Sequence, residues 1–260
     1  MRNELNAIIT IASRDLIKLL RDRPRFLIGF IFPLLFIGIL GGSLQSNLGQ
    51  DAGYNLLVYV FTGVLAQTMF QSTSSGLISL IADRENDFSQ EIFVSPISRY
   101  SIIIGKILGE TLVSLVQGIG IVLLGLLVGV PITLAIFLRV FPAVLVACFL
   151  GGSFGVLVLS RLSDQRQASQ IFPVIIFPQF FLAGVFSPIQ QLPWYLDILS
   201  KISPMRYAVD LVRNFYYLGS PEAAKVQLFS LQTNLIIIGI MFTVFTVIGT
   251  RLFVNNERNR

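Results

Sequence analysis

The chain has 260 residues, of which 54% are hydrophobic and 13% charged, and it carries a formal net charge of +5. Because soluble domains are about a quarter charged, this composition excludes an ordinary soluble domain and predicts an all-α integral membrane protein. Histidine is absent and Cys148 is the single cysteine, which excludes a Cys/His metal site, a disulfide framework and histidine-based catalysis. The basic residues are better explained by membrane topology than by nucleic acid.

Residues 1–25 predict an amphipathic helix that lies in the membrane interface. Seven apolar residues recur at helical spacing, while Arg14, Lys18 and Arg21 fall largely on the opposite face. Pro24 ends the helix and turns the chain into the first span. The helix is either a simple anchor or also a surface for a cytoplasmic partner.

Residues 26–260 predict one transmembrane domain with six spans, each apolar and long enough to cross a bilayer. The spans are Phe26–Leu44, Leu56–Ala82, Ile103–Val130, Phe141–Leu159, Ile171–Phe186 and Leu235–Val254. With an even number of spans both termini lie on one side, and that side then holds most of the Lys and Arg residues. Both termini are therefore expected to be cytoplasmic.

The segment at 83–97 is a charged island between the second and third spans. It predicts a short helix that Pro96 ends. Phe88 and Ile92 are four residues apart and share one face of this helix. Such an apolar pair is explained if it inserts into a groove on another protein. The alternative is a solvated loop with a few apolar residues in the membrane interface.

Residues 188–217, between the last two spans, predict two short helices on the outer side. One runs from about Pro193 to Ile202, and Ser203 and Pro204 begin the next as N-cap and first helical residue. Both helices are too short to span a bilayer. The pair therefore forms a re-entrant or surface-lying loop that packs against the spans or lines a cavity.

Polar residues inside the spans are candidates for a translocation path. Gln67, Gln71 and Ser75 either line such a path or form bonds between helices. Pro178 either kinks the fifth span near a path or marks the turn into the outer loop. Glu110 is an ionisable residue within an apolar span, which suggests a function, but a pair with Lys106 one turn earlier is the alternative.

The sequence lacks a nucleotide-binding loop. The fragment "IGKIL" at 104–108 has neither the earlier glycine nor the following Ser or Thr of a P-loop. Dinucleotide, HExxH and nucleophile-elbow patterns are absent as well. We therefore expect no ATP hydrolysis and no bound cofactor in this chain.

The stretch "RENDFSQEIFVSPISRYSIIIGKILGE" resembles the cytoplasmic loop and following span of ABC-2 type permeases, the membrane subunits of ABC exporters. The matching residues are Glu85, Glu91, Ser95, Pro96, Ser98, Arg99, Gly105 and Lys106. Phe88 and Ser89 stand where the family usually has a Gly-Thr pair, so the local helix geometry is expected to differ. A second stretch, at 180–213, is similar to another characteristic segment of the family. It matches at Gly184, Pro188, Leu192, Pro193, Ser203, Pro204, Tyr207 and Arg213.

The resemblance covers nearly the whole chain and is nearest to drug-resistance and lipid or polysaccharide exporter permeases. It implies that the island at 83–97 is a coupling helix that docks on a separate ATP-binding subunit, where ATP and Mg²⁺ would bind. The coupling residues would be Glu85, Phe88, Ser89, Glu91, Ile92, Ser95, Pro96 and Arg99. The resemblance also implies a path at the interface with a second copy or a related permease.

The expected setting is a bacterial plasma (inner) membrane, and the expected substrate is a lipophilic drug, lipid or lipid-linked glycan. Two other functions are open to the same sequence. An ion-coupled secondary transporter or channel would use Glu110 for coupling. A membrane-embedded lipid enzyme is disfavoured, because the chain has no histidine and no paired intramembrane carboxylates.

Overall fold

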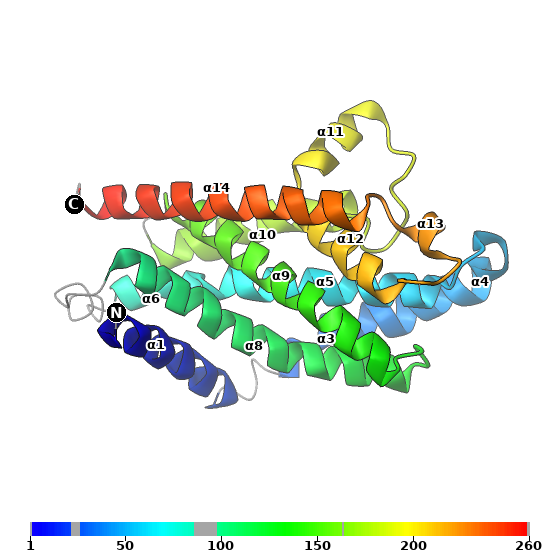
Figure 1. Ribbon diagram of the computed structural model, residues 1–260, viewed down its shortest axis with the longest axis horizontal. Coiled ribbons are helices and arrows are strands. Elements are labelled where there is room, and N and C mark those ends of the chain that lie inside the picture. Colours follow the sequence, from blue (N-terminus) through cyan, green and yellow to red (C-terminus); the bar gives the residue numbers. More distant parts are fainter. Residues whose placement is uncertain (1, 22–26, 86–97, 163, 259–260) are drawn as a thin grey trace.

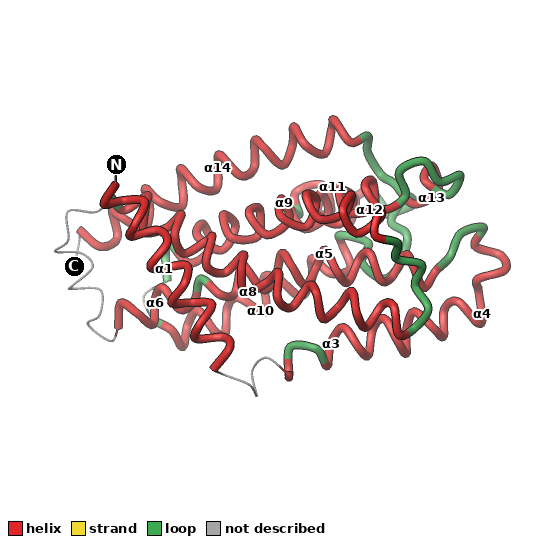
Figure 2. The backbone as a smooth tube through the Cα atoms, turned by 60° about the horizontal axis from the view of Figure 1, so that its bottom comes forward, coloured by secondary structure: helices red, strands yellow, loops and turns green. Residues whose placement is uncertain are grey.

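The structure is a computed structural model that describes residues 2–21, 27–85, 98–162 and 164–258. Every regular element within these ranges is a helix. Most helices follow the long axis of an elongated bundle, and the chain begins and ends at the same end of it (Figure 1). Figure 2 shows the same placement of the two ends from a second direction. The all-α prediction is thus confirmed for the described residues.

The first helix, α1 (Arg2–Arg21), is amphipathic as expected. It lies along α8 (Arg99–Leu127). Gly105 and Gly109 of α8 permit the close approach, because a Cβ atom at either position would lie 3.0–3.1 Å from a Cα atom of α1. Other apolar residues of α1, such as Leu5, remain exposed. One face of α1 is therefore committed to the bundle and another is left for lipid.

Five helical stretches in the described part of the chain are long and apolar enough to cross a membrane. They are Ile31–Ala52, Leu56–Asp83, Tyr100–Leu127, Leu134–Leu159 and Ala223–Phe253. The first combines α3 (Ile31–Pro33), the π-helical η1 (Leu34–Gly41) and α4 (Gly42–Ala52), and the second combines α5 (Leu56–Gly76) and α6 (Ile78–Glu85). The others correspond to α8, to α9 (Leu134–Leu159), and to α13 (Ala223–Val226) with α14 (Leu231–Arg258).

The predicted span Ile171–Phe186 coincides largely with α10 (Gln165–Leu182), which is not one of these five stretches. Its first six residues include three glutamines and Arg166, so its apolar part is short. The fourth predicted span also differs from the structure, because α9 begins at Leu134 and not near Phe141. The Arg139 side chain donates to the Leu218 carbonyl oxygen at 3.1 Å, so this cation is accommodated within the helix.

Helix α5 forms the centre of the bundle, and most of its side chains are buried. Its closest contact is with α9 at two glycines one helical turn apart. A Cβ atom at Gly151 would collide with the backbone oxygen of Phe70, and one at Gly155 would lie 2.6 Å from that of Ser74. The Ser74 hydroxyl lies 2.6 Å from the Gly151 carbonyl oxygen. Small residues thus let two membrane helices approach backbone to backbone.

The two short helices expected between the last spans are present as α11 (Trp194–Ile202) and α12 (Pro204–Tyr216). Helix α12 is almost entirely buried against α5, α9 and α14, whereas α11 extends away from the bundle (Figure 1). Ser203 occupies the N-cap position of α12, but its hydroxyl donates to Gln179 Oε1 at 3.1 Å and not to the helix. The hydroxyl therefore ties α12 to α10.

Replacing Gly151 by valine should disrupt the bundle, because the new side chain has no space between α9 and α5. Overpacking of this kind costs about 1–3 kcal/mol or more. We expect G151V to lose most of its monodisperse yield after detergent extraction and to melt earlier than the wild type. Gly239 of α14 is the matched control, since a Cβ atom there meets nothing within 4 Å. Equal melting temperatures for G151V and G239V would contradict the described contact.

Candidate functional site

A cleft of about 1060 Å³ lies between α1, α5, α6, α8 and α10. Much of its wall consists of uncharged polar side chains. These are Gln67, Thr68, Gln71, Ser72, Ser75, Ser79, Gln117, Gln165 and Ser169. Apolar residues of the first span and of α10, including Phe32 and Phe180, line another part of the cleft. The cleft therefore offers both hydrogen-bonding and apolar surface.

The cleft brings together four of the five residues predicted for a translocation path. Gln67, Gln71 and Ser75 recur every fourth residue on one face of α5, and Glu110 reaches the cleft from α8. Pro178 is not among the residues that line it and lies on an exposed side of α10. The role of the four residues in transport stays a prediction.

Gln67 is almost completely buried, with 1% of its surface exposed. Its Nε2 donates to Gln71 Oε1 at 2.6 Å, whereas its own Oε1 has no hydrogen-bond partner. The bond lies within α5, so it does not join two helices. A buried acceptor without a partner costs about 1–3 kcal/mol, which makes Gln67 a position that a ligand would satisfy.

A buried ion-pair cluster adjoins the cleft and connects three helices. Lys106 Nζ of α8 lies 2.7 Å from Asp15 Oδ2 of α1, 3.9 Å from Asp83 Oδ2 of α6 and 3.6 Å from Glu110 Oε1. Arg14 also pairs with Asp83. Lys106 is only 1% exposed, so removing one of these ion-pair partners would leave a buried group without compensation.

The structure thus confirms that Glu110 pairs with Lys106, the alternative to a transport function that the sequence had offered for Glu110. Its Oε1 also accepts from the Ser79 hydroxyl at 3.2 Å. The same residue lines the cleft. Asp15 was not predicted as a member of this site, because it is 91 residues from Lys106 along the chain. The signal that could have indicated a further acidic partner is a basic residue, Lys106, within an apolar helix.

Six of the predicted coupling residues lie outside the described residues, namely Phe88, Ser89, Glu91, Ile92, Ser95 and Pro96. The described helices on either side do include the other two, since Glu85 is the last residue of α6 and Arg99 the first of α8. Ser98 is the N-cap of α8, and its hydroxyl accepts from the Ser101 backbone N–H at 3.1 Å. The predicted coupling segment therefore runs from the C-terminal end of α6 to the N-terminal end of α8.

Helix α1 is bonded to this same start of α8. Glu4 accepts hydrogen bonds from the hydroxyls of Ser101 and Ser98. These bonds, with that of Ser101 the largest cause, lower the pKa of the Glu4 carboxyl below its usual value. A carboxylate beside the N-terminus of α8 is also stabilised by the helix dipole. The N-terminal helix therefore contacts the cluster at Asp15 and the end of the predicted coupling segment at Glu4.

The predicted outer loop is organised around Arg213 of α12, which is fully buried. Arg213 Nη2 donates to the Gly184 carbonyl oxygen at 2.8 Å, and the guanidinium lies 3.6 Å from the centre of the Tyr59 ring. The Tyr59 hydroxyl donates to the same carbonyl at 3.1 Å. Gly184 has a φ of +66°, which glycine adopts without strain. These residues close the loop onto α5.

The other predicted loop residues have simpler positions. Pro204 is the buried first residue of α12, and Tyr207 donates from its hydroxyl to the Lys201 carbonyl oxygen at 2.8 Å. Pro188 and Pro193 are exposed.

Asp210 of α12 is a buried residue that was not predicted from the sequence as part of the outer loop. Its carboxylate accepts from the backbone of Leu228 and Phe229 and from the Asn234 side chain at 2.7–2.9 Å, which fixes α12 to α14.

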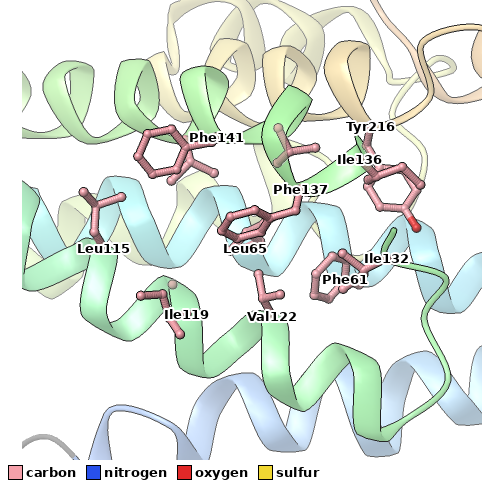
Figure 3. Close-up of a pocket in the computed structure, with 13 residues that line it drawn as sticks. Phe61, Leu65, Leu115, Ile119, Val122, Ile132, Ile136, Phe137, Phe141 and Tyr216 are labelled. Carbon is pink, nitrogen blue, oxygen red and sulfur yellow. The ribbon is translucent and has the colours of Figure 1, made fainter. Parts of the chain in front are cut away.

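A second, smaller cavity of about 90 Å³ lies between α5, α8, α9 and α12 (Figure 3). Its walls are apolar, and the residues include Phe61, Leu65 and Phe137. The only hydroxyl at its wall belongs to Tyr216, and it donates to the Pro131 carbonyl oxygen at 2.8 Å. A ligand in this cavity would therefore make apolar contacts but would find no unpaired hydroxyl to bond with.

Breaking the cluster at Lys106 should destabilise the protein strongly. Removing one partner of a buried ion pair costs about 3–5 kcal/mol, so K106M and D15N should each melt well below the wild type in detergent. The double variant should lose less than the sum of the two, because neither charge is then left alone. K201M is the matched control, since Lys201 pairs with Asp197 on the exposed helix α11. If K106M melted like K201M, the cluster would not stabilise the fold.

Residues 6–217 match the protein family described as "ABC-2 type transporter". The chain is 26% identical over 260 residues to a putative transport permease, ycf38, of Cyanophora paradoxa, covering 96% of this chain and 88% of the relative. It is 29% identical over 140 residues to the probable multidrug ABC transporter permease YbhR of Escherichia coli K12, covering 54% and 38%. It is 21% identical over 193 residues to nodulation protein J of Rhizobium leguminosarum bv. viciae, covering 74% of each chain.

The family match covers the amphipathic helix, the cleft, the cluster and the outer loop, and ends after α12. It agrees with the resemblance carried by the stretches around Pro96 and Pro204. Together with five helices fit to cross a membrane, it establishes that this chain is an integral membrane protein and belongs to the ABC-2 type transporter family as a permease.

Proposed function

We propose that this chain is the permease subunit of an ATP-driven exporter and that the polar cleft forms its part of the translocation path. The observation that carries the proposal is the cleft itself, which places Gln67, Gln71, Ser75 and Glu110 on one surface in a member of the ABC-2 family. The proposed substrate is a lipophilic drug, lipid or lipid-linked glycan. The name of the Escherichia coli relative, a probable multidrug ABC transporter permease, supports a drug as one of these substrates.

A separate ATP-binding subunit supplies the energy in this proposal and holds ATP and Mg²⁺. The lack of a P-loop in the sequence supports it. A second copy of the chain, or a related permease, completes the path in this proposal, since a symmetric dimer is the simplest closed assembly. The cleft then opens toward the partner permease.

The coupling segment at 83–97 is proposed to dock on the ATP-binding subunit. It connects α6 to α8, and both helices contribute walls of the cleft. Lys106 joins α8 to Asp83 of α6 and to Asp15 of α1. A displacement of the segment would therefore move three cleft-lining helices as a unit. This is the proposed route by which ATP binding changes the shape of the path.

We propose six spans, with α10 as the fifth membrane-crossing helix. Its 18 residues extend about 27 Å, close to the hydrocarbon thickness of about 30 Å. Its apolar part begins at Ile171 and is shorter, so its polar first turns are proposed to lie at the membrane interface. An even number of spans agrees with the chain beginning and ending at one end of the bundle (Figure 1). The many basic residues there support a cytoplasmic location in a bacterial plasma membrane.

The position of Glu110 in the cleft wall favours one rival, an ion-coupled carrier or channel. The two functions differ in what they require. The rival needs the Glu110 carboxylate and no ATP-binding subunit, so E110Q would abolish its transport while changes in the coupling segment would spare it. Transport by the exporter would instead be abolished by changes in the coupling segment.

Aspartate at position 88 or 92 should release the ATP-binding subunit. Each change places a charge where the apolar pair Phe88 and Ile92 is proposed to dock, and we expect copurification of the ATPase in mild detergent to fall at least tenfold. L218D is the control, because Leu218 is an exposed apolar residue just after the end of α12 and outside the coupling segment. An ATPase that stays bound to F88D and I92D, or none bound to the wild type, would contradict the proposal.

A further inference from the structure

We infer that the polar cleft recognises an uncharged head group that bears hydroxyl or amide groups, on an amphipathic molecule whose apolar part lies against the first span and α10. The inference rests on the proposed role of the cleft in transport. It narrows the substrate class to neutral, glycan-like amphiphiles and separates these from cationic drugs and acidic lipids.

The first argument is the unpaired acceptor at Gln67. Gln67 and Thr68 are among the residues that line the cleft, and the buried Gln67 Oε1 and Thr68 hydroxyl have no hydrogen-bond partner. The Gln67 amide nitrogen is already used by Gln71. The free atom is thus an acceptor, and it calls for a donor from the ligand. A hydroxyl or amide N–H supplies such a donor without bringing a charge into a buried site.

The second argument is the balance of charge in and beside the cleft. The buried ion-pair cluster has three acidic members, Asp15, Asp83 and Glu110, and two basic members, Arg14 and Lys106; the exposed Lys18 adds a third basic partner through Asp83. Their formal charges cancel. A cationic or anionic head group would have to compete with these existing pairs and lose its own hydration. A neutral head group has neither cost.

Arg21 also lines the cleft, but it is exposed at the end of α1. An ion pair at such a position contributes little, because water screens it. The polar surface of the cleft consists of side-chain amides and hydroxyls on several walls, with the buried Gln67 on α5, the half-buried Gln117 on α8 and the exposed Gln165 on α10. Amides on separate helices suit a head group with several hydroxyls, each of which can both donate and accept.

The third argument is the apolar part of the wall. Phe32 and Pro33 of the first span and Phe180 of α10 also line the cleft. The rings of Phe32 and Phe180 lie 5.7 Å apart and form one surface. The volume of about 1060 Å³ is at the upper limit for drug-sized ligands. Polar and apolar walls of this size fit a head group together with the start of its lipid chain.

The smaller cavity in Figure 3 shows the contrast. It also borders α5, but through Phe61 and Leu65, and its hydroxyl at Tyr216 is occupied by Pro131. It therefore has no unpaired polar atom for a head group. Of these two cavities in the described part of the chain, only the cleft combines apolar walls with free hydrogen-bonding atoms.

The test uses three probes that share a dodecyl chain with a terminal pyrene and differ only in the head group: glucose, trimethylammonium or carboxylate. Their binding to the complete permease–ATPase complex in lipid nanodiscs is measured by fluorescence anisotropy. We expect the glucoside to bind at least tenfold more tightly than either charged probe. Q67L should weaken glucoside binding about tenfold, since one buried hydrogen bond is lost, and should leave the charged probes unchanged.

Q117L provides a second test on another wall, in case Q67L does not fold, and should weaken glucoside binding as well. Q232L is the matched control, because Gln232 is exposed near the start of α14 and outside the cleft. Equal binding of the three head groups, tighter binding of a charged probe, or glucoside binding that neither Q67L nor Q117L weakens would overturn the inference.

ATP hydrolysis and probe transport in the same complex separate this inference from the proposed function. A charged probe that is transported with ATP and displaces the glucoside would overturn the head-group inference and leave the exporter intact. The opposite result is a glucoside whose binding depends on Gln67, but which neither alters the rate of ATP hydrolysis nor is transported. That result would support the head-group preference and contradict the proposed exporter.

Discussion

The close contact of α5 with α9 is the constraint on which the rest of the structure depends. Helices in lipid gain little from the hydrophobic effect and associate through packing and hydrogen bonds. Gly151 and Gly155 remove the side chains that would keep the two backbones apart. With α8 and α12 on its other sides, α5 is largely enclosed, and on the face that lines the cleft Gln71 and Ser75 are half-buried while Gln67 is buried. The position of the cleft therefore follows from the packing of α5.

The buried cluster at Lys106 is the second element that connects fold to function. Ionisable groups at membrane depth are costly and persist where they pair with one another. Here the pairs join α1, α6 and α8 beside the cleft. Those helices also carry both ends of the predicted coupling segment. An arrangement that stabilises the fold thus also links the proposed docking site for an ATPase to the proposed path for a substrate.

Local patterns in the sequence predicted much of this architecture. Pro204 marked the start of α12, helical periodicity identified α1, and the polar residues Gln67, Gln71 and Ser75 of the second span were identified as candidates for the path. Such features depend on neighbours in the chain. The resemblance to the ABC-2 family was confirmed over most of the sequence. The coupling role of residues such as Phe88 stays a prediction.

Features that depend on distant contacts were missed. The partner of Lys106 is Asp15, and the partners of Asp210 lie in the segment before α14, which no local spacing indicates. The unpaired oxygen of Gln67 is known only once its surroundings are known. The start of the fourth span was predicted near Phe141, after the charged Arg139, but α9 begins at Leu134. Arg139 is tolerated inside the helix because its guanidinium donates to the Leu218 carbonyl oxygen at the end of the outer loop. Pro178 was grouped with the path, yet it faces away from the cleft.

The most direct test of the account is the accessibility of the cleft during the ATP cycle. Cys148 is the only cysteine and is buried, so a C148A/Q71C variant carries one reporter thiol in the cleft. The labelling rate with a polar maleimide is measured in the permease–ATPase complex, without nucleotide and after trapping with ATP and vanadate. The account predicts fast labelling without nucleotide and a several-fold lower rate in the trapped state. The same labelling rate in both states would contradict the claim that this cleft is the path that ATP controls.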